Sequence, residues 1–334
     1  MKKTYYLFNP GRLSRKDNTL KFIAVDEEGQ EQSARYIPIE GISDLYIFGA
    51  LEANSALYNF LGKNRIAVHF FDYYENYTGS FMPREYLLAG RVLIAQSQHY
   101  TDEEKRLFIA RQFIEAASHN ILKNLRYYQS RCKDLEAEIA AIETHREAIF
   151  QIERVAELMG VEGNIRQIYY QAFNTIISDF EMPGRSKQPP LDEVNALISF
   201  GNMMCYSTCL RQIYHTQLNP TISFLHQPGE RRYSLALDLA EIFKPILVDR
   251  VIFKVLNKRM INAADFDQNL NRCYLKDSGK KVFIKAYEER LNETIQHRVL
   301  KKKVSYGHLI KLECFKLVKH ILGEQNYKAL KIWW

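Results

Sequence analysis

The first 83 residues alternate short apolar segments with polar turn sequences, a pattern typical of β-strands. Asn9-Pro10-Gly11 and the segment 14–18 have the composition of turns. The pattern predicts a β domain over residues 1–83, with one short helix over 55–62. The predicted strands cover residues 4–8, 19–25, 34–39, 44–49, 65–71 and 79–82.

After Pro83 the apolar residues recur at spacings of three and four, which predicts amphipathic helices. We expect Gly160 to end one of these helices and Pro245 to end or kink another. Helical segments continue almost to the end of the chain. The predicted fold class is therefore α+β: a small N-terminal β-strand-rich domain, 1–83, followed by a large all-α C-terminal domain, 84–334.

The composition narrows the class of protein without identifying one. A chain of 334 residues, 46% of them hydrophobic, can form a sizeable core, and its net charge of +7 indicates a modest preference for polyanions. No stretch of 18 apolar residues occurs. We therefore expect a soluble, cytoplasmic protein without a membrane partner.

The five cysteines are odd in number and dispersed, which is typical of reduced thiols rather than of a disulfide framework. Cys205, Cys209 and His215 raise the alternative of a zinc site. The two cysteines are four residues apart inside one predicted helix, and no second clear pair follows. This spacing favours buried helical thiols.

Four residues near breaks in the helical pattern are candidates for a metal site. Glu162 closely follows Gly160, His226 precedes a Pro-Gly loop, and Asp238 and Glu241 are neighbours on one face of the next helix. Carboxylates combined with one imidazole suit Mg²⁺ or Mn²⁺ better than a thiolate zinc site does. Such an ion neutralises a phosphodiester and activates an attacking hydroxyl.

Each candidate also has an ordinary structural explanation. Glu162 could complement the positive end of a helix dipole, and His226 could be a loop histidine bonded to the backbone. Asp238 and Glu241 could lie on a solvated helix edge. Taken singly, each residue favours its ordinary explanation, and spacing alone does not bring Glu162 near His226. Taken together, the four residues favour the metal site.

Three longer motifs give this set a context. They comprise Gly160, Glu162, Gly163, Arg166 and Tyr169; Pro189, Pro190, Asp192, Asn195 and Leu197; and Leu225, His226, Ser234, Leu235, Asp238, Leu239, Glu241, Phe243, Lys244 and Pro245. With these motifs the whole chain resembles the CRISPR-associated integrases, the universal nucleases of the adaptation stage. The short hairpin expected over residues 11–20 favours a type I system.

The resemblance implies that Glu162, His226 and Glu241 bind Mg²⁺ or Mn²⁺, with Asp238 as a further acid of the catalytic set. It implies a metal-dependent endonuclease for double-stranded DNA that is also an integrase. Its catalytic domain would be 84–334, and it would insert captured spacer DNA into the CRISPR array by 3′-hydroxyl attack on a phosphodiester. Alanine at any ligand is expected to abolish this activity and to leave the thermal transition nearly in place.

The same resemblance implies a homodimer formed through the β domain, and a complex with the dimer of the second, small universal CRISPR-associated protein. The alternative function is a catalytically silent DNA-binding scaffold of the same fold. The presence of all three ligand types at the family positions favours the enzyme.

Basic and aromatic residues near the motifs are candidates for DNA contacts. Lys258 and Arg259 could equally cap the end of a helix, and one of Tyr169 and Tyr170 is expected to belong to the core because of its helical spacing. The candidate contacts are Arg166, Arg231, Arg232, Lys244, Tyr169, Tyr206, Lys258 and Arg259.

Overall fold

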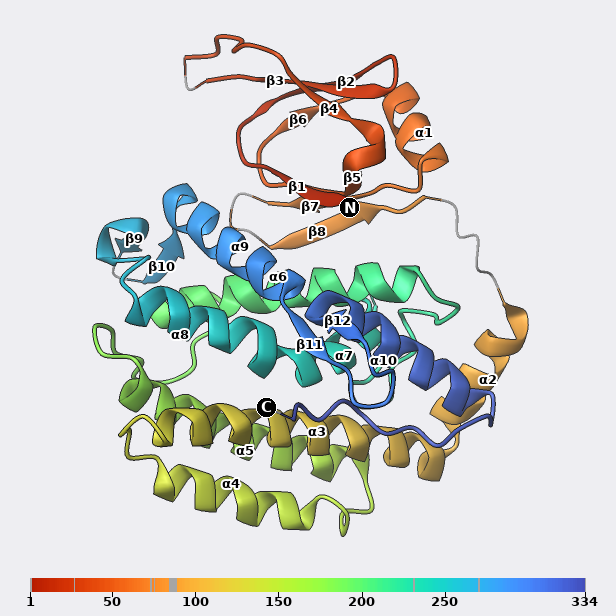
Figure 1. Ribbon diagram of the computed structural model, residues 1–334, viewed down its shortest axis with the longest axis vertical. Helices are drawn as coiled ribbons and strands as arrows, with labels where there is room; N and C mark the ends of the chain where they lie inside the picture. Colours follow the sequence, from red (N-terminus) through yellow and green to blue (C-terminus); the bar gives the residue numbers. More distant parts are fainter. Residues whose placement is uncertain are drawn as a thin grey trace. The chain divides into compact units, whose positions relative to one another are not determined.

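The computed structural model describes residues 2–26, 28–72, 74, 76–83, 89–230, 232–269 and 271–333. The chain divides into two compact units, Met1–Tyr86 and Leu87–Trp334. Figure 1 shows the first as a strand-rich unit and the second as a mostly helical one. The α+β class expected from the sequence is confirmed.

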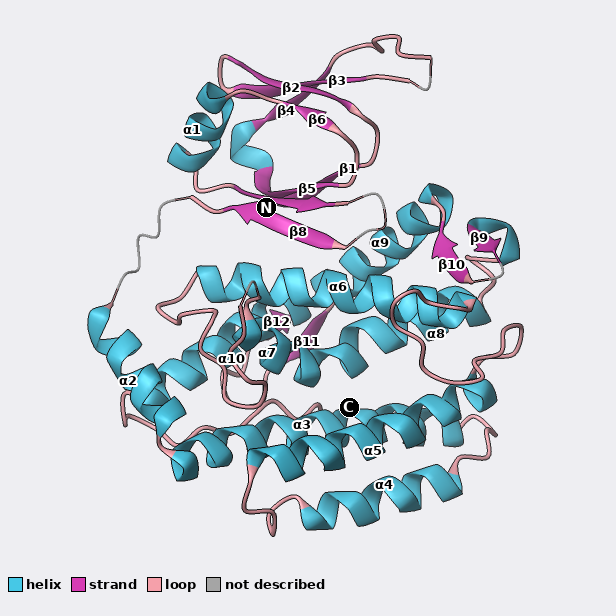
Figure 2. Cartoon of the chain, turned by 180° about the vertical axis from the view of Figure 1, so that it is seen from behind, coloured by secondary structure: helices cyan, strands magenta, loops and turns pink. Residues whose placement is uncertain are grey.

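The described part of the N-terminal unit contains two four-stranded sheets, with strand orders β1-β5-β7-β8 and β4-β3-β2-β6 (Figure 2). In the first sheet β1, β5 and β7 are parallel and β8 is antiparallel to β7. The strands are β1 (Lys3–Leu7), β2 (Gly11–Lys16), β3 (Thr19–Ala24), β4 (Arg35–Pro38), β5 (Ile42–Ile47), β6 (Leu51–Glu52), β7 (Ala67–Phe71) and β8 (Tyr77–Phe81).

The elements predicted for this unit are present, including α1 (Ser55–Lys63), which begins where the Asn54 side chain accepts a hydrogen bond from the Leu57 backbone N–H. The predicted strands did not include β2 or β6, although a short hairpin was expected over residues 11–20. Part of the segment read as a turn, 14–18, is the end of β2. In β2 Leu13 is buried, while the neighbouring Arg12 and Arg15 are exposed. A strand with so little apolar character gives no clear alternating pattern.

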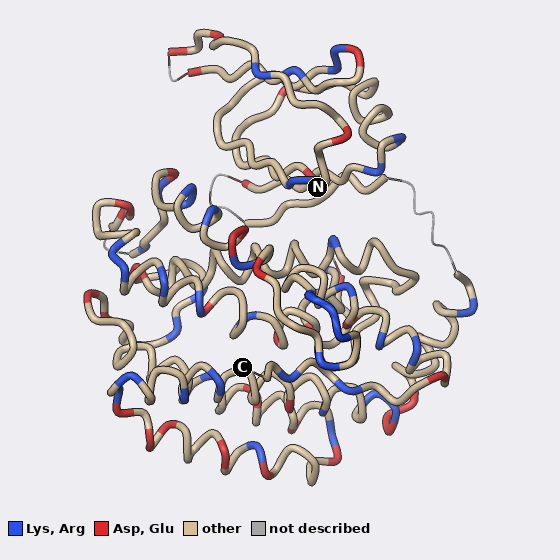
Figure 3. Tube along the Cα trace, in the orientation of Figure 1, with Lys and Arg blue, Asp and Glu red and all other residues tan. Residues whose placement is uncertain are grey.

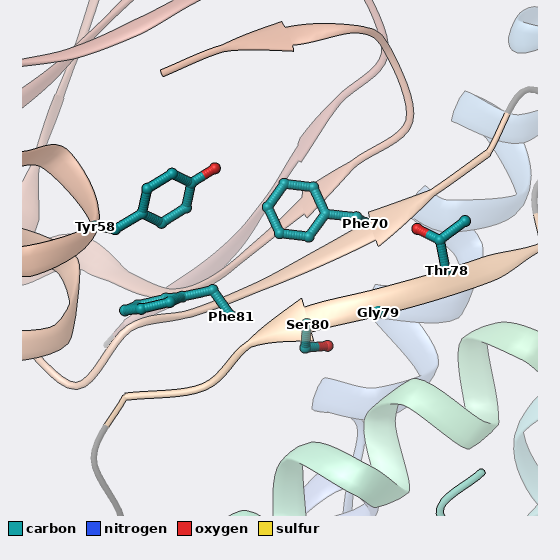
Figure 4. A pocket seen from close by; sticks show the side chains of 6 residues that line it. All are labelled: Tyr58, Phe70, Thr78, Gly79, Ser80 and Phe81. Carbon is teal, nitrogen blue, oxygen red and sulfur yellow. The ribbon is translucent and has the colours of Figure 1, made fainter. Parts of the chain in front are cut away.

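A hollow of about 460 Å³ lies on this unit, between α1 and the β7–β8 edge of the first sheet. Figure 4 shows the rings of Tyr58, Phe70 and Phe81 around it. Thr78, Gly79 and Ser80 of β8 complete its described lining. These side chains include no carboxylate, imidazole or cation.

The C-terminal unit is built mainly from helices. They are α2 (Gly90–Thr101), α3 (Glu103–Gln129), α4 (Glu136–Ala148), α5 (Val155–Ile176), α6 (Glu193–Tyr214), α7 (Ser234–Lys244), α8 (Arg250–Asn257), α9 (Asp277–Asn292) and α10 (Tyr306–Ile321). The unit also contains two short antiparallel hairpins that the sequence pattern did not predict: β9 (Phe266–Asn269) with β10 (Arg272–Leu275), and β11 (Thr294–Gln296) with β12 (Lys303–Ser305).

Helix α7 lies in the core of the C-terminal unit and packs against α3, α6 and α10. Its apolar residues Leu235, Leu239 and Ile242 are completely buried. As predicted, α7 ends at Pro245, but the chain stays helical through the π-helical turn Pro245–Asp249 and continues into α8. The acidic residues of α7 are therefore held by a rigid, fully packed element.

Helix α5 runs through Gly160 without interruption, so the expectation that Gly160 ends a helix was wrong. A glycine ends a helix when it adopts the left-handed conformation, and Gly160 keeps helical geometry instead. The break in the helical pattern lies earlier, between Ala148 and Val155. Glu162 and Arg166 are consequently one turn apart on the same face of a continuous helix.

The cysteines are all free thiols, as predicted, and Cys205 and Cys209 are buried on α6. Burial raises the pKa of the Cys209 thiol well above its ordinary value, which keeps it protonated and unreactive. None of the helices in the described part of the chain combines the length and the apolar character that a bilayer crossing requires.

Candidate active site

His226 lies in the loop between α6 and α7, and the buried carboxylate of Asp238 organises this loop. One carboxylate oxygen of Asp238 accepts the backbone N–H groups of Phe224 at 2.6 Å and Leu225 at 3.0 Å. The other accepts the backbone N–H of His226 at 2.9 Å and lies 2.8 Å from its Nδ1. The ring orientation is thus fixed, and Nε2 is the nitrogen that can bind another group. We call His226 and Asp238 the imidazole side of the site.

Two neighbouring helices hold the same loop. The side-chain amide of Gln96 on α2 donates to the backbone carbonyls of Asn219 at 3.0 Å and Ile222 at 2.7 Å, and the Asn219 backbone N–H donates back to it at 2.9 Å. Arg106 on α3 donates to the carbonyl of Phe224 at 2.9 Å. His226 is therefore presented by a loop that is tied to α2, α3 and α7.

Four charged residues of α5 and α7 form the carboxylate side of the site. Nε of Arg166 donates to Glu162 at 3.0 Å, and Nη2 of the same guanidinium donates to Glu241. Nζ of Lys244 donates to the other oxygen of Glu241 at 2.5 Å. Because Nε and Nη2 form one edge of the planar guanidinium, Glu162 and Glu241 converge on that single edge.

The charges on the two sides shift the pKa values of their members. Burial alone would raise the pKa of Glu241, but Lys244 and Arg166 outweigh it and hold this pKa well below its ordinary range. Burial alone would lower the pKa of His226, but its hydrogen bond to Asp238 and the charge of that carboxylate raise it. The charge of Glu241 also contributes to the raised pKa of His226, which indicates that the two sides lie near each other.

The donor set fits a hard divalent cation in its chemistry, because two carboxylates and an oriented imidazole nitrogen suit Mg²⁺ or Mn²⁺. Among the residues that the structure describes, no group of three His, Cys, Asp or Glu side chains is already arranged around a common metal position. On the carboxylate side, Arg166 and Lys244 supply the positive charge that balances Glu162 and Glu241.

The structure brings the sequence-predicted residues together in two pairs, Glu162 with Glu241 on Arg166 and His226 with Asp238. Glu162 lies inside α5 rather than at a helix start, so the helix-dipole explanation does not apply to it. Asp238 and Glu241 are buried rather than on a solvated edge. Asp238 contacts the His226 loop, whereas Glu241 contacts Arg166 and Lys244.

Three of the predicted DNA contacts are engaged inside the protein. Arg166 is buried between the two glutamates, and Lys244 is bonded to Glu241. Tyr169 is completely buried, where its hydroxyl accepts a hydrogen bond from Asn124 at 3.0 Å. The neighbours of these three side chains give each of them a structural role beside the site.

The other predicted DNA contacts differ in exposure. Arg232 is exposed and donates to the Gln227 carbonyl at 2.7 Å, whereas Arg231 lies outside the described residues. The Tyr206 hydroxyl accepts the backbone N–H of Tyr233 at 3.1 Å. Lysines and arginines are spread over the helices and loops of the C-terminal unit (Figure 3).

Lys258 and Arg259 lie at the end of α8. Lys258 is exposed and is the C-terminal capping residue of this helix, in line with the alternative considered for it. Arg259 is exposed and pairs with Asp179, with 2.8 Å between Nε and Oδ2. Both residues remain on the surface of the unit.

Sequence reasoning missed one acidic residue of this region, Asp249. It ends the π-helical turn after α7, its side chain is buried, and its Oδ2 has no hydrogen-bond partner among the described residues. Burial raises its pKa to about 7, although Arg166, a hydrogen bond from Tyr169 and Lys244 all act in the opposite direction. A single carboxylate inside the apolar sequence of residues 246–253 was the available signal.

Comparison with known proteins places this chain in a family. The family model of the CRISPR associated protein Cas1 matches residues 5–289. The CRISPR-associated endonuclease Cas1 of Fusobacterium nucleatum is 47% identical over 337 residues, which span 100% of this chain and 98% of the relative.

Solved structures agree with this placement. A CAS1 protein from Thermotoga maritima is 38% identical, with a TM-score of 0.85 over 98% of this chain and 100% of that chain. A casposase bound to integration product shares the fold at 20% identity, with a TM-score of 0.87 over 98% of this chain and 92% of that chain. The chain therefore belongs to the CRISPR-associated Cas1 family.

Proposed function

We propose that this chain is a metal-dependent endonuclease for double-stranded DNA and an integrase of CRISPR adaptation. It would insert captured spacer DNA into the CRISPR array by attack of a 3′-hydroxyl on a phosphodiester. The observation that supports this most strongly is the convergence of Glu162 and Glu241 on one guanidinium edge, beside an imidazole that is oriented by Asp238.

The proposed roles follow from the contacts of each side chain. Glu162, Glu241 and Nε2 of His226 would hold Mg²⁺ or Mn²⁺, which when bound neutralises the scissile phosphate and stabilises the developing charge. Asp238 fixes the His226 ring and its Nδ1–H tautomer through a 2.8 Å contact. Because α7 is packed on all sides, Glu241 is positioned by a rigid element, as phosphoryl transfer requires.

The proposed partners are DNA, a second copy of this chain bound through the N-terminal unit, and the dimer of the small second universal CRISPR-associated protein. The family relationship over the full chain supports them. The integrase part is supported by the shared fold of the casposase that is bound to an integration product. The net charge of +7 is compatible with a polyanionic substrate.

Nicking of a supercoiled plasmid tests the nuclease. Wild-type protein is expected to nick the plasmid with Mn²⁺ and not with a chelator. His226→Ala is expected to lose this activity, while His308→Ala, which alters an exposed histidine on α10, retains it. A protein that binds the plasmid but never nicks it would be the silent scaffold.

Strand joining tests the integrase separately. With the small partner dimer present, fragments with free 3′-hydroxyls are expected to become joined to a repeat-containing plasmid. Dideoxy-terminated fragments lack the nucleophile, so they are expected to remain unjoined while metal-dependent nicking continues. Equal joining of both kinds of fragment would reject 3′-hydroxyl attack.

A further inference from the structure

Asp249 is a buried acid beside the site that the proposed chemistry does not use. The π-helical turn Pro245–Asp249 directly follows α7 and places this carboxyl group in the interior. Turns of this kind are rare and often occur at functional sites. The carboxyl group is hydrogen-bonded to the hydroxyl of Tyr169, which in turn accepts a hydrogen bond from Asn124 at 3.0 Å.

Two buried atoms of opposite charge lack hydrogen-bond partners in this region. One is Oδ2 of Asp249 and the other is Nη1 of Arg166, among the residues that the structure describes. The other two nitrogens of Arg166 are bonded to Glu162 and Glu241. Asp249 and Arg166 act on each other electrostatically. An unpaired buried donor and acceptor are costly, so their joint presence calls for an explanation.

The balance of charge around Arg166 explains why these two atoms lack partners. The two cations, Arg166 and Lys244, are balanced by the two carboxylates of Glu162 and Glu241. A divalent cation on these carboxylates would compete with Arg166 for its partners and leave an excess of positive charge in a buried place. Asp249 is the further carboxyl group that acts on both Arg166 and Lys244.

The protonation of Asp249 is compatible with a role in balancing the positive charge of Arg166 and Lys244. Its pKa of about 7, raised by burial, keeps the carboxyl group between its neutral and charged forms near neutral pH. Additional positive charge nearby favours the charged form. The acid can therefore stay neutral in the metal-free site and ionise when the positive charge increases.

We propose that Asp249 is a positioning residue that neutralises and retains Arg166 when a divalent cation takes Glu162 and Glu241. Arg166 then exchanges carboxylate partners inside the protein instead of contacting DNA. This inference rests on the proposed metal site. It predicts that metal affinity depends on Asp249 through Arg166 and not through the general stability of the fold.

The test is a double-mutant cycle on the full chain, with Mn²⁺ affinity measured by isothermal titration calorimetry. Asp249→Asn keeps the shape of the side chain and removes its charge. It is expected to weaken Mn²⁺ binding roughly ten- to hundred-fold, the range typical of residues behind metal ligands. In the Arg166→Gln background the same change is expected to alter affinity by less than about two-fold, because the cation that Asp249 serves is absent.

Asp179→Asn is the matched control, since it removes a carboxylate that pairs with Arg259 on the surface. It is expected to leave Mn²⁺ affinity unchanged. Thermal unfolding of each metal-free variant verifies that it is folded. Should Arg166→Gln not fold, Arg166→Met provides a second background that lacks the cation, and the effect of Asp249→Asn is expected to shrink there too.

The outcomes separate this inference from the proposed function. Equal losses of affinity in both backgrounds, or an unchanged affinity of Asp249→Asn, would overturn the role of Asp249 and leave the metal site intact. A wild-type protein that binds no Mn²⁺ would overturn both.

Discussion

The two sides of the candidate site hold their side chains in place with different hydrogen-bond donors. On the imidazole side, Asp238 accepts three backbone N–H groups as well as Nδ1 of His226, so one buried charge is shared among hydrogen bonds of the loop itself. On the carboxylate side, Glu162 and Glu241 are held by the side chains of Arg166 and Lys244. The first arrangement can persist when a ligand binds, whereas the second has to change.

Because of this difference, the two sides would need different rearrangements to bind a metal ion. Nε2 of His226 needs no rearrangement, because Asp238 binds the opposite nitrogen. Glu241 is already ionised, because Lys244 and Arg166 keep its pKa low. At Glu241 an incoming cation would therefore compete with the protein's own cations, whereas at His226, whose pKa is raised, it would compete with a proton. We therefore expect the carboxylate side to control the affinity for a metal ion.

The largest effect on stability is expected when a glutamate of the carboxylate side is replaced. Glu241→Ala leaves Arg166 and Lys244 buried without their common anion. We expect the free energy of unfolding to fall by about 3–5 kcal/mol, as is typical when one partner of a buried ion pair is removed. Urea denaturation of metal-free protein measures it.

This prediction revises the expectation from sequence that alanine at a ligand leaves stability nearly unchanged. That expectation assumed a polar cleft, whereas Glu241 is buried. Glu289→Ala removes an exposed partner of Lys254 and is the control, with an expected loss below about 1 kcal/mol. Equal effects of the two substitutions would show that burial of the ion pair does not matter.

The pH dependence of the free energy of unfolding is expected to distinguish Asp249 from the acids of the carboxylate side. The pKa of Asp249 rises from 3.8 to about 7 on folding because of burial. The folded state therefore binds more protons than the unfolded state between these values, and the contribution of Asp249 to stability decreases as pH rises through this window.

Asp249→Asn removes this contribution. The stability of metal-free wild type relative to Asp249→Asn is expected to fall from pH 4 to pH 7 and to level off above. Chemical denaturation at a series of pH values measures it. A constant difference between the two proteins would mean that Asp249 is already ionised at pH 4.

A smaller loss is expected on the imidazole side. Asp238→Asn keeps one acceptor oxygen but turns the other into a donor that faces backbone N–H groups. We expect a loss of about 2 kcal/mol in the free energy of unfolding, with weaker Mn²⁺ binding because the His226 ring is no longer fixed. Unchanged Mn²⁺ affinity would show that the orientation of the ring does not limit binding.

The smallest effect on stability is expected for an exposed residue, Arg232. Its substitution should instead change the affinity for DNA. Arg232→Ala, next to the imidazole side, should change stability by less than about 0.5 kcal/mol. If Arg232 contacts a phosphate, the slope of log affinity against log salt should decrease by about 0.9. Fluorescence anisotropy measures it, with Arg259→Ala at the end of α8 as the comparison. Equal slopes for wild type and Arg232→Ala would exclude the contact.

The parts of the fold that the sequence predicted have a strong periodic pattern. β7 and α1 are examples, since most of their core-facing positions are apolar. β2 was missed because its residues are mostly charged or polar, and β9 and β10 because hairpins of four-residue strands carry too few positions for a pattern. The prediction for Gly160 was wrong because glycine adopts both the helical and the left-handed backbone conformation, and the sequence does not show which one it takes.

The sequence predicts the acids and the histidine of the candidate site, and this remains a prediction, but it did not predict the contacts of the cations. Motif positions identified Glu162, His226 and Glu241, whereas charge alone suggested that Arg166 and Lys244 contact DNA. Only the fold shows that both are turned inward. The four-residue spacing of Glu162 and Arg166 on one helix was the sequence signal for their pairing.

The loop that carries His226 has a consequence for the entropy of substrate binding. Gln96, Arg106 and Asp238 fix its backbone in the folded protein itself. Ordering a flexible residue costs about 1–2 kcal/mol of conformational entropy, and here this cost is part of folding rather than of substrate capture. A ligand that meets His226 therefore finds a loop with little freedom left to lose, and more of its contact energy appears as affinity.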